Sequence, residues 1–482
     1  MKRLTIWIPI LIAALAINVA SAQGTLPGSG WWTGEQVQNV GTATARVAIT
    51  IYDKNTSNTW RADREIAPGA SYTFTPFDPE LSSSATQGSA IVSADQPIRA
   101  IVNVTNIKAG SLGQDGGKAA AQYQGFDASA TANTLLFPLV KGDYYGHTTS
   151  FYVQNAGNAA ATAQAVFKMR TGAVYTYTTP SIGPGQMVVF SIYDAGYTPP
   201  TNQDGRVGSL IVTSAQPLAG VSLEHKTVEN PATLLQGTRG FTPADYDSKA
   251  YAPVIKHQWY GRFTGIQVQN PNTIDITVTV TYKGTDGACR GSTYTESHAV
   301  PAGGAYTFVQ FAGYTPLPSP CLASATIEGT GNFVALVNEG ALSGYPPAGI
   351  TYSAIPNKVA TTKVSAPLFK DNYYKNTSGL QIQNVGTVRA TNVVATFNCT
   401  TRGGSSFVAV SKPQTIEPGA AYLFFRPSTR PDVFTTSNPF VSDQANCAVT
   451  VTSDQPIVAI VNEMGWGISM DDNNYEGFNL TP

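Results

Sequence analysis

Two lysine, asparagine and glutamate sets recur in the sequence and could form covalent cross-links. The residues are Lys256, Asn338, Glu339, Lys370, Asn462 and Glu463. Some bacterial surface β-sandwiches join a first-strand lysine to a last-strand asparagine through an isopeptide bond, which an acid assists and which releases ammonia. The competing interpretation is a hydrogen-bond network at the strand ends, which buried polar groups require in any case.

Four adjacent aromatic pairs could bind a sugar by ring stacking. They are Trp31-Trp32, Tyr144-Tyr145, Trp259-Tyr260 and Tyr373-Tyr374. Adjacent residues of a strand point to opposite faces, so one ring of each pair should enter the core while the other faces outward. The outward ring could stack on a carbohydrate or on a neighbouring repeat. We favour core and inter-repeat packing over carbohydrate contact.

Motifs that carry enzyme chemistry are absent from the sequence. It has no HExxH, GxSxG or SxxK motif and no glycine-rich phosphate or dinucleotide fingerprint. The four histidines occupy no common position. We therefore predict a non-enzymatic protein without cofactors. A secreted hydrolase remains an alternative, because the separation of two catalytic carboxylates is a spatial property.

The four cysteines predict two disulfides and argue against a metal site. The pairs Cys289–Cys321 and Cys399–Cys447 each stay within one repeat, and an oxidising compartment favours their formation. Zinc ligands are usually closely spaced, whereas the sequence contains no CxxC. The run Asp471-Asp472-Asn473-Asn474 could offer oxygens to Ca²⁺, but it lacks the alternation and glycine of an EF-type loop.

The composition excludes several classes of protein. The formal net charge is −1, and charged residues make up only 12% of the chain. Nucleic-acid binding is therefore not expected, because no basic surface is available to contact phosphates. Hydrophobic residues make up 42%, which is enough for several cores and excludes global disorder.

The N-terminus predicts export. Lys2 and Arg3 precede an apolar run over residues 6–19, and Ala20-Ser21-Ala22 is a small-x-small cleavage signal. We predict a signal peptide over residues 1–22 and no membrane span after its removal. The expected location is extracellular, at the cell surface.

Four markers recur in the same order with a period of about 115 residues. Gln-Asn dipeptides occur at residues 38–39, 154–155, 269–270 and 383–384. A Pro-Gly turn or a relative follows each of them, and a Gln-Pro turn follows in three of the four cases. We therefore predict repeats over residues 23–130, 131–245, 246–360 and 361–482.

Each repeat is predicted to be an immunoglobulin-like β-sandwich. Short segments rich in Val, Ile, Thr and aromatic residues alternate with turn residues every 8–12 positions. A β-propeller is the competitor, but its blades repeat at about 45 residues. The first repeat lacks most of its leading strand. Longer stretches between repeats carry Tyr-x-Gly-Phe, as at residues 123–126 and 475–478, and should pack down onto the core.

The motifs resemble those of secreted tandem-repeat proteins from the envelopes of Chloroflexota-like bacteria, which are mostly uncharacterised. The matching residues are Val153–Gly157, Gly208–Ser214 and Ile457–Glu463. The resemblance covers all four repeats and implies an extracellular β-sandwich array.

We expect a structural or adhesive protein of the bacterial exterior, in which four sandwiches form a rod or a curved string. Its partners would be envelope proteins, polysaccharide or further copies of the chain. Exposed edge strands could join chains, with the first repeat as acceptor. The main alternative is a multivalent carbohydrate-binding array.

Overall fold

The computed structural model describes residues 26, 31–82, 87–106, 119–226, 234–345, 349–374, 376–425, 427, 431–435, 444–465 and 473–480. The predicted leader and Asp471-Asp472 lie outside these residues. The described chain is all-β, with only short 3₁₀ turns between strands, which confirms the predicted fold class at that level.

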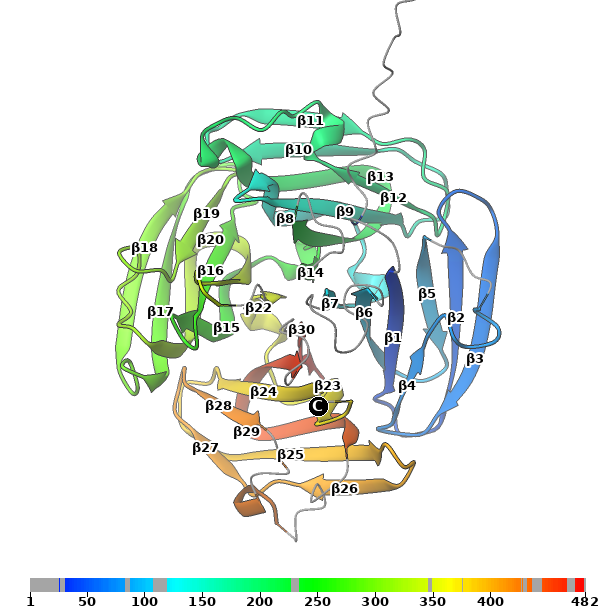
Figure 1. Cartoon of the computed structure of the whole chain (residues 1–482), viewed down its shortest axis with the longest axis vertical. Helices are drawn as coiled ribbons and strands as arrows, with labels where there is room; N and C mark the ends of the chain where they lie inside the picture. The colour runs from blue at the N-terminus through cyan, green and yellow to red at the C-terminus, as the bar shows by residue number, and fades with distance from the viewer. Residues whose placement is uncertain are drawn as a thin grey trace, which may run out of the picture.

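The strands fall into four groups along the chain, separated by colour in Figure 1. Group 1 contains β1 (Trp31–Asn39), β2 (Ala45–Asp53), β3 (Thr59–Ile66), β4 (Ser71–Phe74), β5 (Gly88–Ala94), β6 (Ile98–Asn106) and β7 (Ala120–Gln124).

Group 2 follows a 3₁₀ turn, η1 (Ala128–Ala130). It contains β8 (Ala132–Tyr144), β9 (His147–Asn155), β10 (Ala163–Met169), β11 (Val174–Thr178), β12 (Met187–Ser191), η2 (Ile192–Ala195), η3 (Gln203–Arg206), β13 (Val207–Lys226) and β14 (Leu235–Arg239).

Group 3 follows the turn η4 (Pro243–Asp245). It contains β15 (Asp247–His257), β16 (Arg262–Gln269), β17 (Ile276–Gly287), β18 (Thr293–Val300), β19 (Ala305–Val309), β20 (Cys321–Ala341), β21 (Thr351–Ser353) and β22 (Ile355–Pro356).

Group 4 follows the turn η5 (Asn357–Val359). It contains β23 (Thr361–Asp371), β24 (Asn376–Asn384), β25 (Ala390–Thr401), β26 (Ser406–Val410), β27 (Gln414–Ile416), β28 (Ala421–Phe425), η7 (Pro431–Val433), β29 (Ala445–Gly465), β30 (Asn473–Glu476) and β31 (Phe478–Asn479).

Each group has two antiparallel layers with the same pairing order. The inner layers, nearer the centre of Figure 1, are β4-β1-β6-β7, β12-β9-β13-β14, β19-β16-β20-β21 and β28-β24-β29-β30. The outer layers are β3-β2-β5, β11-β10-β13-β8, β18-β17-β20-β15 and β26-β25-β29-β23. In groups 2 to 4 one long strand belongs to both layers, and its register with the leading strand shifts between them. In group 1 that long strand is divided into β5 and β6.

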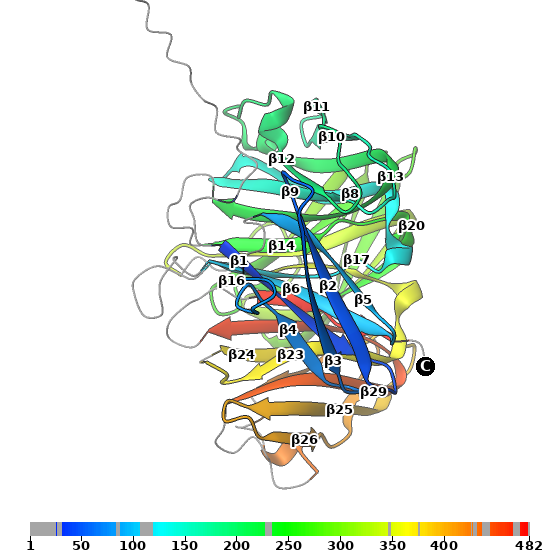
Figure 2. The same cartoon turned by 90° about the vertical axis from the view of Figure 1, so that its right-hand side faces the viewer.

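The four groups close into a ring, so the expectation of a rod or a curved string is wrong. Figure 1 shows the groups in chain order around a common centre, with group 4 beside group 1, and Figure 2 shows the ring from its side. Gln124 Nε2 of group 1 donates to the Glu476 carbonyl of group 4 at 2.6 Å. Between groups 2 and 3, Lys168 Nζ donates to the Ala302 carbonyl at 2.9 Å.

The apolar cores continue across the boundaries between groups, which explains the closure. Ile101 of group 1 lies in the core cluster of group 4, and Val458 and Ile460 of group 4 lie in that of group 3. A further cluster joins Leu139 of group 2 to Leu336 of group 3. An open rod would expose the surface that Ile101 shares with group 4, and closure of the ring removes that surface from water.

The short strands β7, β14, β21 and β30 meet at the centre of the ring. Thr238 Oγ1 of β14 lies 3.3 Å from Ser353 Oγ of β21, and the Thr351 amide donates to Asn474 Oδ1 at 3.2 Å. Tyr475 is 1% exposed, and its hydroxyl donates to the Leu368 carbonyl at 2.6 Å. The prediction that the Tyr-x-Gly-Phe segments pack down is confirmed for the described residues.

Both predicted disulfides are present. Cys289 pairs with Cys321 in group 3, and Cys399 pairs with Cys447 in group 4. Cys399 and Cys447 are directly opposite each other on β25 and β29. The prediction that each bond stays within one strand group is confirmed.

Candidate interaction surfaces

The asparagine of each Gln-Asn marker ties two turns of its group together. The Asn155 side-chain amide donates to the Ala159 carbonyl at 2.7 Å and to the Ile182 carbonyl at 2.8 Å. Its Oδ1 accepts from the Gly157 amide at 2.8 Å. Equivalent bonds form at Asn39, Asn270 and Asn384. The recurrence of Gln-Asn and of the Pro-Gly turn therefore has one structural cause, because this amide holds the turn.

The glutamine of the marker contacts the neighbouring group in groups 1, 3 and 4, whereas Gln154 of group 2 donates to the Gly185 carbonyl of its own group at 2.9 Å. Gln383 Nε2 of group 4 donates to the Ala325 carbonyl of group 3 at 3.3 Å, and Gln269 Nε2 of group 3 donates to the Leu210 carbonyl of group 2 at 3.5 Å. Gln38 of group 1 accepts from Ser365 of group 4. A single sequence marker thus stabilises both the group and the ring.

The aromatic pairs of groups 2 to 4 lie at tight hairpin turns. The first residue of each pair ends a strand or forms a bridge, and the second lies in the turn, so the expectation that both belong to a strand is wrong. Tyr144 pairs with His147 across the turn, which leaves Tyr145 and Gly146 as a two-residue loop with φ values of 48° and 79°. Two positive φ values define the type I′ turn that suits a right-handed hairpin. The corresponding turns carry Tyr260 and Tyr374, with φ values of 48° and 49°.

The second ring of each of these pairs is exposed. Tyr145, Tyr260 and Tyr374 are 71%, 80% and 56% exposed, while their neighbours Tyr144 and Trp259 are half-buried. Within each pair the two rings pack edge to face, with their centroids 4.6 to 5.0 Å apart. A positive φ is unfavourable for a bulky residue, so the structure holds each tyrosine outward at an energetic cost.

The three turns occupy one face of the ring. The strand that follows each turn begins opposite the end of the long strand: His147 pairs with Lys226, and Arg262 pairs with Ala341. Trp31-Trp32 does not belong to this set, because it lies within β1, where Trp31 pairs with Asn106. The four aromatic pairs are therefore three equivalent turns and one strand segment.

The predicted cross-link residues form buried ion pairs. Lys256 Nζ lies 2.6 Å from Glu339 Oε2, and Lys370 Nζ lies 2.8 Å from Glu463 Oε1. Neighbouring residues of a strand point to opposite faces. Asn338 is therefore directed away from the face that Lys256 approaches. The isopeptide bond remains a prediction, which intact mass would test.

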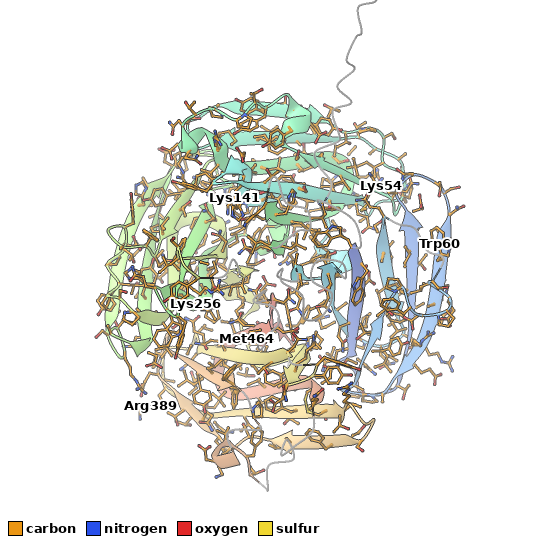
Figure 3. The ribbon with its side chains drawn as sticks, in the orientation of Figure 1. Lys54, Trp60, Lys141, Lys256, Arg389 and Met464 are labelled. Atoms are coloured by element: carbon orange, nitrogen blue, oxygen red, sulfur yellow. A yellow bond between two sulfur atoms is a disulfide. The ribbon has the colours of Figure 1, made fainter. Side chains whose placement is uncertain are left out.

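Group 2 contains a third buried pair, at a position where the sequence has the lysine and the glutamate of the predicted cross-link but lacks the asparagine. Lys141 Nζ lies 2.6 Å from Glu224 Oε1, and His147 Nδ1 lies 3.1 Å from the same oxygen. Burial by itself raises the pKa of Glu224, but Lys141 and His147 outweigh it and hold that pKa at about 2. Figure 3 shows Lys141 and Lys256 on the inner side of their groups. The Pro-x-x-Lys spacing, which recurs at residues 138–141, 253–256 and 367–370, could have indicated this pair from the sequence.

A serine–histidine contact occurs in group 2 alone. Ser150 Oγ lies 3.0 Å from His225 Nε2, and these two residues are 0% and 4% exposed. The other groups carry glycine at the position of Ser150, namely Gly34, Gly265 and Gly379. Because both side chains are enclosed, a substrate has no path to the hydroxyl, and the contact fits packing between strands better than catalysis.

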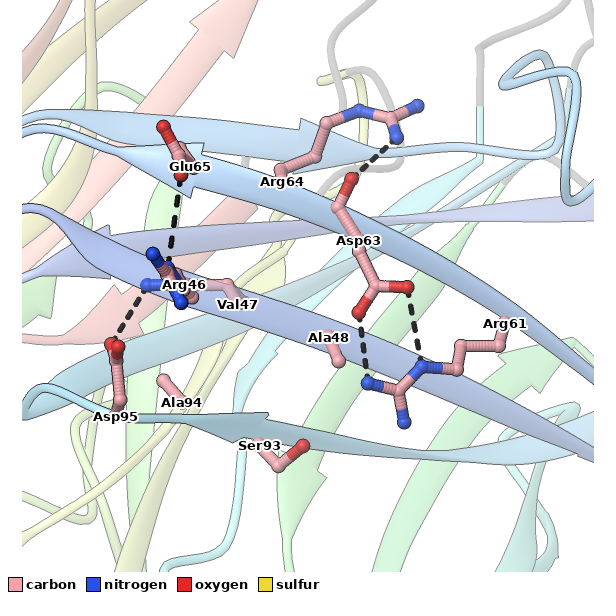
Figure 4. A pocket seen from close by; sticks show the side chains of 10 residues that line it. All are labelled: Arg46, Val47, Ala48, Arg61, Asp63, Arg64, Glu65, Ser93, Ala94 and Asp95. Carbon is pink, nitrogen blue, oxygen red and sulfur yellow. Dashed lines mark hydrogen bonds and ion pairs between the residues drawn. The ribbon is translucent and has the colours of Figure 1, made fainter.

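A shallow depression of about 620 Å³ lies on the outer layer of group 1 (Figure 4). It is lined by Arg46, Val47, Ala48, Arg61, Asp63, Arg64, Glu65, Ser93, Ala94 and Asp95. Arg61 bonds to Asp63 at 2.8 Å, and Asp95 accepts from the Arg46 amide at 2.8 Å. These charges satisfy one another, so the depression does not indicate a charged ligand.

Comparison with known proteins gives little further information. No family model matches the chain, and no curated protein matches it. Part of the chain is similar to a solved structure described as "Crystal Structure of Thermotoga maritima 1070", with 10% sequence identity and a TM-score of 0.20. The match covers 23% of this chain and 95% of that chain. A similarity of this size supports no conclusion about function.

Two functional features are absent from the described ranges. There, no helix is long and apolar enough to cross a membrane. The same part of the chain contains no group of three or more His, Cys, Asp or Glu residues that could hold a metal ion.

Proposed function

We propose that this chain is a non-enzymatic structural or adhesive protein of the bacterial cell surface, made of four immunoglobulin-like repeats. The observation that carries the proposal is the closed ring. The recurrent markers of the sequence serve contacts within and between the groups, as Gln269 and Gln383 illustrate. The repeated part of the sequence therefore holds the groups of the ring together.

Two observations favour an extracellular location. The bonds Cys289–Cys321 and Cys399–Cys447 suit an oxidising compartment. The N-terminal residues have the pattern of an export signal. The resemblance to secreted envelope proteins of Chloroflexota-like bacteria points the same way.

Fractionation and electron microscopy together test the proposal. The protein expressed from its full precursor should appear on the cell exterior, where protease added to intact cells removes it. Negative-stain images of the secreted protein should show rings that associate with envelope fragments or with each other as concentration rises. Isolated rings at every concentration, with no retention on envelope fragments, would contradict a structural or adhesive role.

A multivalent carbohydrate-binding array is the second candidate, favoured by the three exposed hairpin tyrosines. Three weak sites on one face would act together by avidity. Changing Tyr145, Tyr260 and Tyr374 together to Ala should abolish retention on envelope polysaccharide. Tyr314→Ala is the matched control, because Tyr314 is 73% exposed but lies outside these turns. Equal retention of both variants would exclude this role for the tyrosines.

A further inference from the structure

Among the described residues, the outer layer of group 1 has a free edge at β5, where the other groups have a strand. In group 2 the leading strand β8 covers the first half of β13, with Phe137 opposite Leu210 and Leu135 opposite Val212. Strands β15 and β23 do the same in groups 3 and 4. In group 1 the matching strand is β5, which pairs with β2 alone among the described residues.

The free edge leaves the core of group 1 partly open. Residues 88–92 of β5 match residues 208–212 of β13, so Ala90 and Val92 correspond to Leu210 and Val212. Leu210 and Val212 are 0% exposed under β8, whereas Ala90 and Val92 are only partly buried. A covering strand in group 1 would bury the same positions.

A polar group faces the uncovered position. Glu35 lies three residues before Gln38, as Phe151 lies three residues before Gln154. The ring of Phe151 packs against Phe137 of the leading strand, with centroids 5.0 Å apart. Glu35 is half-buried, and its enclosed Oε2 has no hydrogen-bond partner in the described part of the chain. The place of Phe137 in group 1 therefore suits a residue that can donate a hydrogen bond.

Leu26 is the one residue of the corresponding segment in group 1 that the structure describes. In the repeat spacing, the segment that corresponds to β8 is residues 16–28, most of which belong to the predicted leader. Cleavage after residue 22, as predicted, would remove residues 16–22 of that segment. Leu26 packs against the apolar cluster that includes Val104 and Leu223, at the boundary with group 2.

We propose that the free edge of β5 binds an extended strand of a partner protein, antiparallel to β5, as the missing leading strand of group 1. This inference rests on the proposed surface function and names its attachment site. The pattern of the partner follows from the three internal leading strands, which share apolar-x-apolar-Pro-apolar-apolar-Lys at residues 135–141, 250–256 and 364–370. Main-chain pairing would supply affinity and the inward side chains specificity.

Two features adapt this pattern to group 1. A lysine, or another donor, replaces the inward residue before proline, because Glu35 faces that position. The lysine that ends the pattern is not required. Val104 pairs with Thr33 in group 1 as Glu224 pairs with Thr149 in group 2, so group 1 has no carboxylate at the place where that lysine would bind. The expected strand therefore carries its positive charge two positions after its first apolar residue.

A peptide exchange tests the proposal with the secreted protein. The probe is a labelled peptide of residues 132–144 with Phe137→Lys, compared with the unchanged peptide in a fluorescence-anisotropy titration. The lysine peptide should bind at least tenfold more tightly to the natural chain. The variant Glu35→Phe should reverse that preference, since it restores the aromatic pair of group 2.

Two variants show whether the edge itself is the site. Val92→Asp places a charge beside the bound strand and should abolish binding, whereas Val408→Asp, on the exposed part of β26, should leave it unchanged. Far-ultraviolet circular dichroism checks that both variants fold. The absence of binding by either peptide would overturn the proposal. A dimer of the natural chain that Val92→Asp dissociates would also overturn it, since a second copy would then hold the edge.

This result is separable from the proposed function. Retention on envelope fragments without peptide binding would leave the surface role intact and refute the strand site. Peptide binding without any retention would refute the surface role and leave the strand site intact.

Discussion

In the part of the chain that the structure describes, groups 1 and 2 have inner layers with the same strand order, but their outer layers differ by one strand. The two groups also differ in the residues of the core and in buried charge. In group 2, β8 contributes Phe137 to the core and Lys141 to the buried pair with Glu224. In group 1, where β5 has a free edge, Glu35 occupies the position of Phe151 and Val104 that of Glu224.

The substitutions in group 1 are mutually consistent. A glutamate at the position of Val104 would lack its lysine and leave a buried charge uncompensated, which is strongly unfavourable. An apolar residue there avoids that cost. Within the described ranges, the leading strand and the buried lysine–glutamate pair occur together in groups 2 to 4, and group 1 has neither.

The largest difference in the effect of a substitution on the free energy of unfolding is expected between the equivalent positions 151 and 35. Phe151→Ala should lower the free energy of unfolding of group 2 by about 3–5 kcal/mol, because it creates a cavity in a fully buried aromatic cluster. Glu35→Ala should cause no loss, because it removes an unpaired carboxyl. Hydrogen exchange resolved by strand group measures both. An equal loss in the two variants would refute the contrast.

Loss of one partner of a buried ion pair in groups 2 to 4 should lower the free energy of unfolding far more than loss of one partner of a surface pair. Glu339→Gln should cost about 3–5 kcal/mol, because Lys256 then keeps a buried charge without its partner. Glu417→Gln is the matched control, since its pair with Arg389 is exposed and should contribute at most about 1 kcal/mol. Urea denaturation measures both, and similar midpoints would show that the interior pair is hydrated.

The stability contributions of Glu35 and Glu224 should respond to pH in opposite directions. Burial raises the pKa of Glu35 to about 7, so the free energy of unfolding should fall as pH rises from about 4.5 through 7. The pKa of Glu224 is about 2, so its stabilisation is present above about pH 4.5 and is lost as pH falls toward 2. Each effect is on the order of 3 kcal/mol.

Two variants separate these pH effects. The stability gained by Glu35→Gln over the natural chain should grow as pH rises, and the stability lost in Glu224→Gln should shrink as pH falls. Urea midpoints recorded from pH 3 to pH 8 provide the measurement. A pH-independent difference for Glu35→Gln would show that its carboxyl is well hydrated.

The smallest effect is expected at the hairpin tyrosines. Tyr260→Ala should change the free energy of unfolding by about 0.5 kcal/mol or less, because the ring is 80% exposed. Tyr260→Gly should stabilise the turn, since glycine adopts φ of 48° without strain. A large loss in Tyr260→Ala would mean that the ring supports the group itself.

The sequence alone determined the features that depend on local pattern. Alternating apolar residues and turn residues predicted an all-β chain, and cysteine positions within a repeat predicted Cys289–Cys321 and Cys399–Cys447. That the first repeat lacks most of its leading strand stays a prediction, because residues 1–25 and 27–30 lie outside the described part of the chain.

The tertiary structure decided whatever depends on contacts between distant segments. The rod expectation failed because closure depends on a surface that Ile101 shares with group 4, and no local pattern encodes that contact. The aromatic pairs were misplaced because a positive φ at Tyr145 follows from the register of β8 and β9, not from residue type. The ionic partner of Lys256 likewise depends on which face of β20 it meets. Local periodicity fixes the strands, whereas burial of their shared apolar faces fixes the ring.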